Sequence, residues 1–360
     1  MPNLPLEILN VGVSLVCMGL IHWQTKQHGL RTNYSPERIG LFDALKGVCI
    51  VGVLLIHAAY LTPVSTPIYR TLDFAVPFFF VSSGFLLSVR CNGRIDLKEY
   101  YQKLFFRVLL IYLIFVIGTR IFKGGELTVR DIFLDALLGR TNYNYYFIPI
   151  ILQLYILFPY LIKFREKFNN TVIFCLIAAV SFLSYIGNHY IEQPDWNTNP
   201  WYLVFIGKDF AYFCFGIFLS QYEIRKIRFR GFFSSFMIFL AGTLLLIFLT
   251  GEYRLSYAYP FAAFMFALVL YNIIKEHQWL WILEDLGRYS LVVYLVHSTI
   301  QRTVVMKYFY IKEMPWGFEL IVVVGTTLML SYAFARMFMA VYGPATAYLS
   351  PIGRRGSVKK

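Results

Sequence analysis

The chain has 360 residues, of which 58% are hydrophobic, 19% are aromatic and only 15% are charged. This composition, with a mean hydropathy of +0.59, excludes an ordinary soluble globular protein and predicts an all-α, polytopic bundle of transmembrane helices. The net charge of +13 is compatible with nucleic acid, but the basic residues form short clusters between apolar runs, with no basic face or binding motif. We therefore expect membrane lipids, and no nucleic acid, among its partners.

Apolar runs near the ~20 residues that cross a bilayer recur along the chain. The first, at 4–23, is weakened by Glu7 and is interpreted as an additional N-terminal helix. Ten core helices are predicted at about 42–62, 72–90, 104–122, 144–163, 171–189, 201–220, 232–250, 256–274, 289–306 and 318–342. The expected domains are an N-terminal apolar helix with a basic loop (1–35), one membrane domain (36–342) and a basic cytoplasmic tail (343–360).

Lysine and arginine gather in alternate loops, and this sets the predicted orientation of the helices. The connections around 26–38, 90–103, 163–167 and 225–230 are basic and are predicted to be cytoplasmic, whereas 187–201 contains no lysine or arginine. On this count the N-terminus lies outside and the C-terminus inside. The connection 119–143 is a mild exception, because it carries Arg120, Lys123, Arg130 and Arg140.

The cysteines indicate no bound group. They lie in or beside apolar runs without paired spacing, at Cys17, Cys49, Cys91, Cys175 and Cys214. We therefore expect neither a disulfide framework nor a metal site, and no permanently bound cofactor.

Three ionisable side chains, Asp43, Lys46 and His57, interrupt the apolar run that begins at residue 42. Polar groups at membrane depth are costly, so they mark a functional site by default. At about 100° and 1.5 Å per residue, Lys46 and His57 are nearly eclipsed and about 16 Å apart along the helix axis. With the lysine near the cytoplasmic surface and the imidazole in the outer half, this face suits a long molecule with an anionic head and a reactive tip.

Each of these side chains also has a purely structural interpretation. His57 can act as a general base near neutral pH, or it can be a core histidine bonded to a neighbouring helix. Lys46 can hold a phosphate or extend to the inner surface. Asp43 can orient Lys46 for a ligand or simply form an ion pair with it.

Two further groups are candidates for binding. Lys103 and Arg107 lie four residues apart on one helix face, where they can bind phosphates together with Lys46 or serve as ordinary cytoplasmic charge. Tyr294 and His297 lie three residues apart and share a face.

Ser83 and Gln153 complete the candidates. Ser83 lies in the aromatic run 76–86, interrupted by Pro77 and Gly84, and can donate to a substrate or satisfy helix backbone. Gln153 lies in the middle of the run 144–163, where an amide needs a partner.

These motifs together resemble the acyltransferase-3 family of integral membrane acyltransferases. The resemblance rests on the run 42–47 continuing to His57, the aromatic run 78–86 and the stretch Tyr146-Phe147-Ile148-Pro149 with Gln153, Tyr155 and Pro159. The segment 287–297 is similar to the family's SLxxYLxH helix. The family's Arg-x10-His pair maps onto Lys46 and His57, its paired arginines onto Lys103 and Arg107, and its mid-chain tryptophan onto Tyr146.

The resemblance implies transfer of an acyl group, usually acetyl, from cytoplasmic acyl-CoA to a hydroxyl of a carbohydrate or lipid-linked sugar on the outer side. His57, Lys46 and Asp43 are then the expected catalytic set, and Lys46, Lys103 and Arg107 the expected acyl-CoA site. Ser83, Gln153, Tyr294 and His297 are the expected acceptor-binding residues. The family's commonest setting implies the cytoplasmic (inner) membrane of a bacterium. The sequence leaves the acceptor, the acyl chain and a homo-oligomeric state open.

Two other functions fit intramembrane ionisable residues. One is a transporter, either proton-coupled through His57, His297 and Asp209 or a flippase of a lipid-linked saccharide. The other is a non-catalytic membrane partner of a polysaccharide synthase, for which His57 would be dispensable.

Overall fold

The computed structural model describes residues 40–59, 68, 72, 74–91, 95–169, 171–173, 175–177, 179–180, 207–221, 277, 279–308 and 315–349. Within these ranges the regular structure is entirely helical, which confirms the predicted all-α class. Four helical stretches are long and apolar enough to cross a membrane: Gly40–Ala59, Leu97–Phe122, Phe147–Lys167 and Gly317–Thr346. The predicted helices at 4–23, 232–250 and 256–274, most of 171–189, and the termini 1–35 and 350–360 lie outside the described residues.

Most described helices coincide with predicted apolar runs. They are α2 (Gly40–Ala59), α4 (Ala75–Cys91), α8 (Phe147–Lys167), α11 (Gly207–Leu219) and α17 (Trp316–Leu349). The run predicted at 289–306 is α15 (Ser290–Ile300), a π-helical turn η3 (Gln301–Val305) and α16 (Met306–Tyr308). Pro77 and Gly84 do not interrupt α4, because Pro77 lies in its first turn and Gly84 lies inside a continuous helix.

The run predicted at 104–122 begins earlier, at Leu97. It consists of α5 (Leu97–Leu104), a second π-helical turn η1 (Phe105–Leu109) and α6 (Leu110–Phe122). Asp96 fixes this start, because its carboxylate accepts from the backbone N–H of Lys98 at 2.9 Å and of Glu99 at 3.2 Å. The N-cap therefore adds about two turns of polar helix to the apolar run.

Two short helices were not predicted, α7 (Val129–Leu138) and α14 (Leu280–Arg288). Both are too short to span a bilayer. Thr128 caps α7 by accepting from the N–H of Asp131, and Gly139 ends it with a left-handed φ of 65°. A side chain at Gly139 would also approach the backbone of Tyr145, so this turn leads the chain tightly into the segment that precedes α8.

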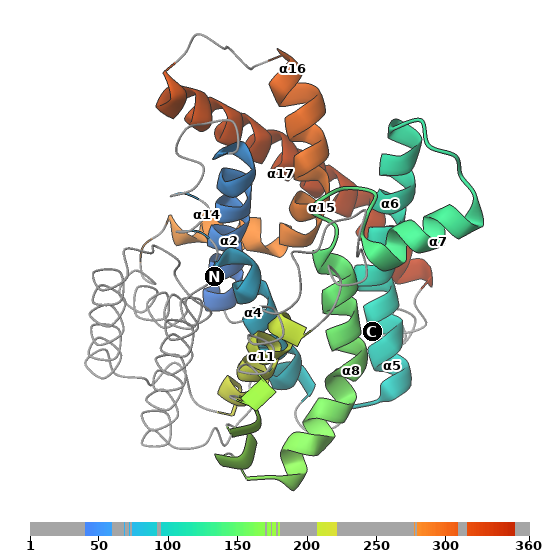
Figure 1. Ribbon diagram of the computed structural model, residues 1–360, viewed down its shortest axis with the longest axis vertical. Coiled ribbons are helices and arrows are strands. Elements are labelled where there is room, and N and C mark those ends of the chain that lie inside the picture. The colour runs from blue at the N-terminus through green and yellow to red at the C-terminus, as the bar shows by residue number, and fades with distance from the viewer. Residues whose placement is uncertain are drawn as a thin grey trace, which may run out of the picture.

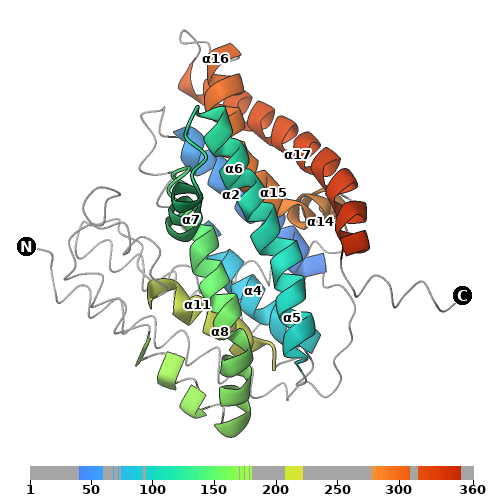
Figure 2. The ribbon, with the colours of Figure 1, turned by 90° about the vertical axis from the view of Figure 1, so that its right-hand side faces the viewer.

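The helices form one elongated bundle with two distinct ends (Figures 1 and 2). Helix α16 and the end of α6 lie towards one end, and α5 and the C-terminal half of α8 lie towards the other. We call these the outer end and the inner end, following the orientation predicted from the loop charges.

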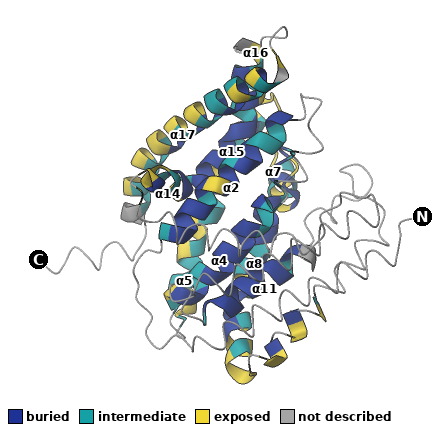
Figure 3. Ribbon diagram, turned by 90° about the vertical axis from the view of Figure 1, so that its left-hand side faces the viewer, coloured by how far each residue is buried: buried dark blue, intermediate teal, exposed yellow. Residues whose placement is uncertain are grey.

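Burial separates a core from an apolar surface (Figure 3). Most of α2, α4 and α11 is buried, whereas α17 presents one exposed side. That side is apolar, with Ile321 70% exposed and Val341 74% exposed. An apolar exposed face on a helix of this length is typical of contact with lipid.

Two helix pairs cross at glycines. A Cβ atom at Gly287 of α14 would collide with the carbonyl oxygen of Asp43 in α2, and one at Gly84 of α4 with the carbonyl oxygen of Phe213 in α11. Small residues let membrane helices approach this closely. The crossing at Gly287 holds α14 across α2, directly before Arg288 and the start of α15, and so determines where α15 begins.

Candidate active site

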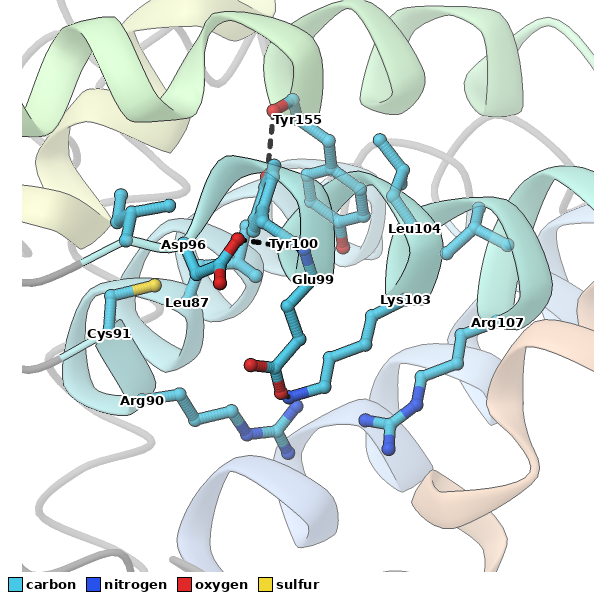
Figure 4. A pocket seen from close by; sticks show the side chains of 12 residues that line it. Leu87, Arg90, Cys91, Asp96, Glu99, Tyr100, Lys103, Leu104, Arg107 and Tyr155 are labelled. Atoms are coloured by element: carbon cyan, nitrogen blue, oxygen red, sulfur yellow. Dashed lines mark hydrogen bonds and ion pairs between the residues drawn. The ribbon is translucent and has the colours of Figure 1, made fainter. Parts of the chain in front are cut away.

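The inner end contains a cavity of about 430 Å³ between α4, α5, η1 and α8. Figure 4 shows the charged side chains of Arg90, Glu99, Lys103 and Arg107 converging on one side of this cavity. Its other walls are Leu87, Cys91, Ile95, Asp96, Tyr100, Leu104, Val108 and Tyr155. The volume is in the range of small-molecule sites, and the charged side is predominantly cationic.

A second cavity, of about 540 Å³, lies beside the first, between α5, η1 and α6, the α14–α15 junction and α17. Lys103 and Arg107 line both cavities, and Arg288 and Tyr289 add the junction. Tyr342 of α17 closes one side, where its hydroxyl donates to the carbonyl of Phe106. One pair of cations therefore borders two adjoining spaces.

Only some of the inner cations are neutralised. Lys103 pairs with Glu99 at 2.5 Å, and Arg288 lies 3.4 Å from Asp285. Within the described ranges, no carboxylate lies within ion-pair distance of Arg90 or Arg107. Since Arg107 sits on the π-helical turn η1 and is exposed, its guanidinium donors are available to an anionic ligand.

The outer end contains a pair of histidines. The rings of His57, in α2, and His297, in α15, lie 5.3 Å apart with an interplanar angle of 23°. Tyr143 packs edge-on against His57 at 4.8 Å. His297 is fully buried, whereas His57 is half-buried with its Nδ1 atom enclosed.

Each histidine presents one buried nitrogen that has no hydrogen-bond partner among the described residues, Nδ1 of His57 and Nε2 of His297. His297 Nδ1 lies 2.7 Å from the carbonyl oxygen of Tyr294. Because a carbonyl only accepts, Nδ1 carries the proton in the neutral ring and Nε2 keeps a lone pair. An orphaned acceptor beside a second imidazole is a place where a hydroxyl group can bind.

The segment 142–145 is fastened to α15 by a buried hydrogen-bond network. Asn144 donates to the Tyr294 carbonyl at 2.9 Å and accepts from Ser298 at 3.0 Å, while Tyr145 donates to the carbonyl of Leu295 at 3.0 Å. Asn142 donates to Ser298 at 2.6 Å. Since these bonds fix the segment on both sides of Tyr143, they hold that ring against His57.

A model of the acyltransferase-3 family, described as an acyltransferase domain, matches residues 39–336. The chain belongs to the acyltransferase-3 family. It is a membrane acyltransferase, and the match includes α2, both cavities and the histidine pair. No curated protein and no solved structure matched the chain.

The two residues that correspond to the family's Arg-x10-His pair lie at different depths in α2. His57 joins the histidine pair, whereas Lys46 is half-buried and is absent from the walls of both inner cavities. Asp43 is buried, 8% exposed, and packs behind the α14–α15 junction. The structure thus brings Lys103 and Arg107 together, but it does not bring Lys46 into the same cavity walls.

The expected acceptor residues of this acyltransferase fall into two places. Tyr294 donates to the Asn144 carbonyl, and its ring lies 5.7 Å from His297. Ser83 accepts from Tyr155 at 3.0 Å, so it reaches the inner cavity only through that tyrosine. Gln153 donates to the Pro149 carbonyl at 3.1 Å within its own helix. Their roles towards an acceptor stay predictions.

Three residues of these sites belong to none of the sequence motifs: Arg90, Tyr143 and Arg302. Arg90 lies in a basic connection predicted to be cytoplasmic, and Tyr143 directly precedes the predicted run 144–163. A signal for Arg302 was present, because an arginine within the apolar run 289–306 is costly unless it has a function.

Proposed function

We propose that the protein transfers an acetyl group from cytoplasmic acetyl-CoA to a hydroxyl of a cell-surface or lipid-linked carbohydrate, with His57 as the base or the transient acyl carrier. We further propose that it does so as a multi-pass protein of a bacterial cytoplasmic membrane. The observation that carries this proposal is that two cation-lined cavities lie at one end of the bundle and a pair of stacked histidines, one of them fully buried, lies towards the other.

The inner cavities suit the polyanionic end of a coenzyme A thioester. Arg107, Arg90 and Lys103 supply three cationic groups on one side of the first cavity, two of them without an ion-pair partner in the described part of the chain. Guanidinium groups bind phosphate oxygens through two parallel hydrogen bonds. We assign the nucleotide phosphates to these residues, with Lys46 deeper along α2.

The second cavity leads along α15 towards the histidines. Val292 lines its wall, and His297 lies five residues further along the same helix, about 7.5 Å at helical rise. An extended thioester arm that enters beside Tyr289 can therefore follow α15 to the space beside His57. This supports a donor that enters from the inner end and reacts deeper in the bundle.

In the direct reaction, His57 takes the proton of the acceptor hydroxyl while the hydroxyl oxygen attacks the thioester carbonyl carbon. The new C–O bond forms, the C–S bond breaks, and the departing thiolate takes the proton from the imidazolium. Alternatively, a neutral His57 nitrogen attacks the thioester carbonyl carbon first, the C–S bond breaks, and the departing thiolate takes the proton of the other ring nitrogen. The acceptor hydroxyl then attacks the acyl carbon, the C–N bond breaks, and the imidazole takes the hydroxyl proton. In both routes we assign to His297 Nε2 a hydrogen bond from another polar group of the acceptor.

The test uses a strain that lacks the gene and carries wild type, His57→Ala or His277→Ala, with equal membrane levels of each protein. His277 is an exposed histidine and serves as the matched control. Mass spectrometry of the surface glycans should find the acyl ester with wild type and His277→Ala, and not with His57→Ala.

Two results would contradict parts of the proposal. Full restoration by His57→Ala would remove His57 from the reaction. Unchanged acylation in every strain would remove the transferase function, and gradient-driven transport would then be tested in vesicles. Binding of acetyl-CoA by the purified protein, without any gradient, distinguishes a transferase from a transporter, because a transporter of another solute does not need to bind acetyl-CoA.

A further inference from the structure

The outer end carries four cations in the connection 119–143 and a fifth on η3. They differ in whether a carboxylate neutralises them. Asp135 pairs with both Arg120 and Arg140, the latter at 2.7 Å, and Asp131 lies 3.1 Å from Arg120. These ion pairs account for the predicted exception to the positive-inside rule, because the two arginines are neutralised locally. Arg130, Lys123 and Arg302 have no carboxylate within ion-pair distance in the described part of the chain.

Arg302 lies beside the candidate catalytic centre. Its guanidinium carbon is 4.3 Å from the centre of the Tyr143 ring, and Tyr143 packs in turn against His57 at 4.8 Å. The side chain is exposed, and it belongs to the π-helical turn η3. A cation stacked on an aromatic face keeps its N–H donors free at the ring edge.

Lys123 contacts the same segment. Its ammonium group donates to the carbonyl of Thr141 at 2.6 Å, two residues before Tyr143. Arg302 and Lys123 therefore both border the segment 141–143. Burial and the positive charge of Arg302 lower the pKa of Lys123, and Asp135 offsets this in part. The repulsion between the two cations is a cost that a bound anion would remove.

We propose that the acceptor carries an anionic group, a phosphate or a carboxylate, close to the hydroxyl that is acylated, and that Arg302 and Lys123 bind this group against Tyr143. The Tyr143 ring then separates the bound anion from His57. This arrangement presents the acceptor hydroxyl to His57, the proposed base. This inference rests on the proposed function and adds the charge of the acceptor to it. The two cations are specificity determinants rather than catalytic residues.

The experiment measures the initial rate of acyl transfer from radiolabelled acetyl-CoA to the endogenous acceptor in isolated membranes containing the full chain. It compares Arg302→Gln, Lys123→Gln and Arg302→Lys with wild type. Arg130→Gln is the matched control, because Arg130 is an exposed cation on α7 that has no ion pair and no ring contact with Tyr143. Tandem mass spectrometry of the product determines the charge of the acyl-bearing unit.

We expect the acyl-bearing unit to contain a phosphate or a carboxylate, and the mass identifies which. Arg302→Gln should lower the rate about tenfold, as expected for loss of one charge-assisted contact, and Arg302→Lys should restore part of it. Lys123→Gln should have a smaller effect in the same direction, and Arg130→Gln none. The wild-type rate should fall with rising salt more steeply than the rate of Arg302→Gln.

A neutral acyl-bearing unit would overturn the inference, and so would wild-type rates in both Arg302→Gln and Lys123→Gln. If Arg302→Gln also loses acetyl-CoA binding, this variant is misfolded and does not test the inference. The transfer rate of Lys123→Gln and the charge of the acyl-bearing unit then test the inference instead. Absence of any transfer by wild type would instead reject the proposed function, a result distinct from transfer to a neutral sugar.

Discussion

Both ends of the bundle present an arginine on a π-helical turn, but the surroundings of the two turns differ. Arg107 on η1 lines two cavities together with further cations, whereas Arg302 on η3 lies over a single tyrosine ring beside the histidine pair. A π-helical turn inserts one residue into a helix and so changes the direction of the side chains around it. Under the proposed function, the same backbone device would serve the polyanionic donor at one end and the anionic group of the acceptor at the other.

This difference between the two ends follows from the free-energy cost of removing a charge from water in a membrane protein. At the inner end, the cations that line the cavities are exposed, so several of them can gather without large desolvation costs. At the outer end, the amides of Asn142 and Asn144 bond to α15 around the fully buried His297, and the cations nearby are exposed. Binding of the donor and proton transfer are therefore expected to be separable by mutation.

The strongest test of this separation is His297→Ala. Removing the Nε2 atom that would position the acceptor beside His57 should lower kcat about 100-fold, the cost of a misplaced reactant, and leave acetyl-CoA affinity within about twofold. Rates and equilibrium binding on the purified protein check this. His297→Asn, which keeps a polar group at shorter reach, should retain more activity than alanine.

If His297→Ala weakens acetyl-CoA binding as much as it lowers kcat, the two ends are not independent. A matching loss in His277→Ala would indicate a general effect of removing a histidine.

Arg107→Gln tests the inner end, where we expect a change in donor affinity rather than in kcat. Loss of a charge-assisted contact to phosphate should raise the acetyl-CoA Kd about 10- to 100-fold, while kcat at saturating donor stays within about threefold. Isothermal titration and saturation kinetics measure the two quantities. Lys167→Gln, at the exposed inner end of α8, is the control, and an equal effect there would reduce the role of Arg107 to general inner charge.

A smaller effect is expected from Asn144→Ala, which removes two buried hydrogen bonds between the 142–145 segment and α15. Interhelical hydrogen bonds in membrane proteins contribute about 0.6 kcal/mol on average and up to about 1.7 kcal/mol, so we expect a loss of that size in the free energy of unfolding. Thermal denaturation in detergent measures it. Thr303→Ala, which removes a hydroxyl bonded to its own helix, should change stability less.

The sequence predicted the parts of this architecture that have a local pattern. The apolar run of α2 and the four-residue spacing of Lys103 and Arg107 are such patterns, and both residues do line the same cavities. The contact between Asn144 and Tyr294 joins residues 150 positions apart, and no periodicity encodes it. Arg302 is visible in the sequence as an isolated charge within an apolar run, but only folding shows which side chain that charge meets.

The smallest predicted effect concerns the charge of Lys123. Because folding lowers its pKa through burial and the charge of Arg302, the folded chain holds this proton less tightly than the unfolded chain, so Lys123 disfavours folding at neutral pH and the penalty fades as pH rises. Arg302→Gln should raise the pKa of Lys123 towards the ordinary lysine value, whereas Arg130→Gln should leave it unchanged. Competitive labelling of Lys123 across a pH series measures the pKa. A pKa that is the same in both variants would mean that the two cations do not sense one another, and a shared anion between them would lose its electrostatic basis.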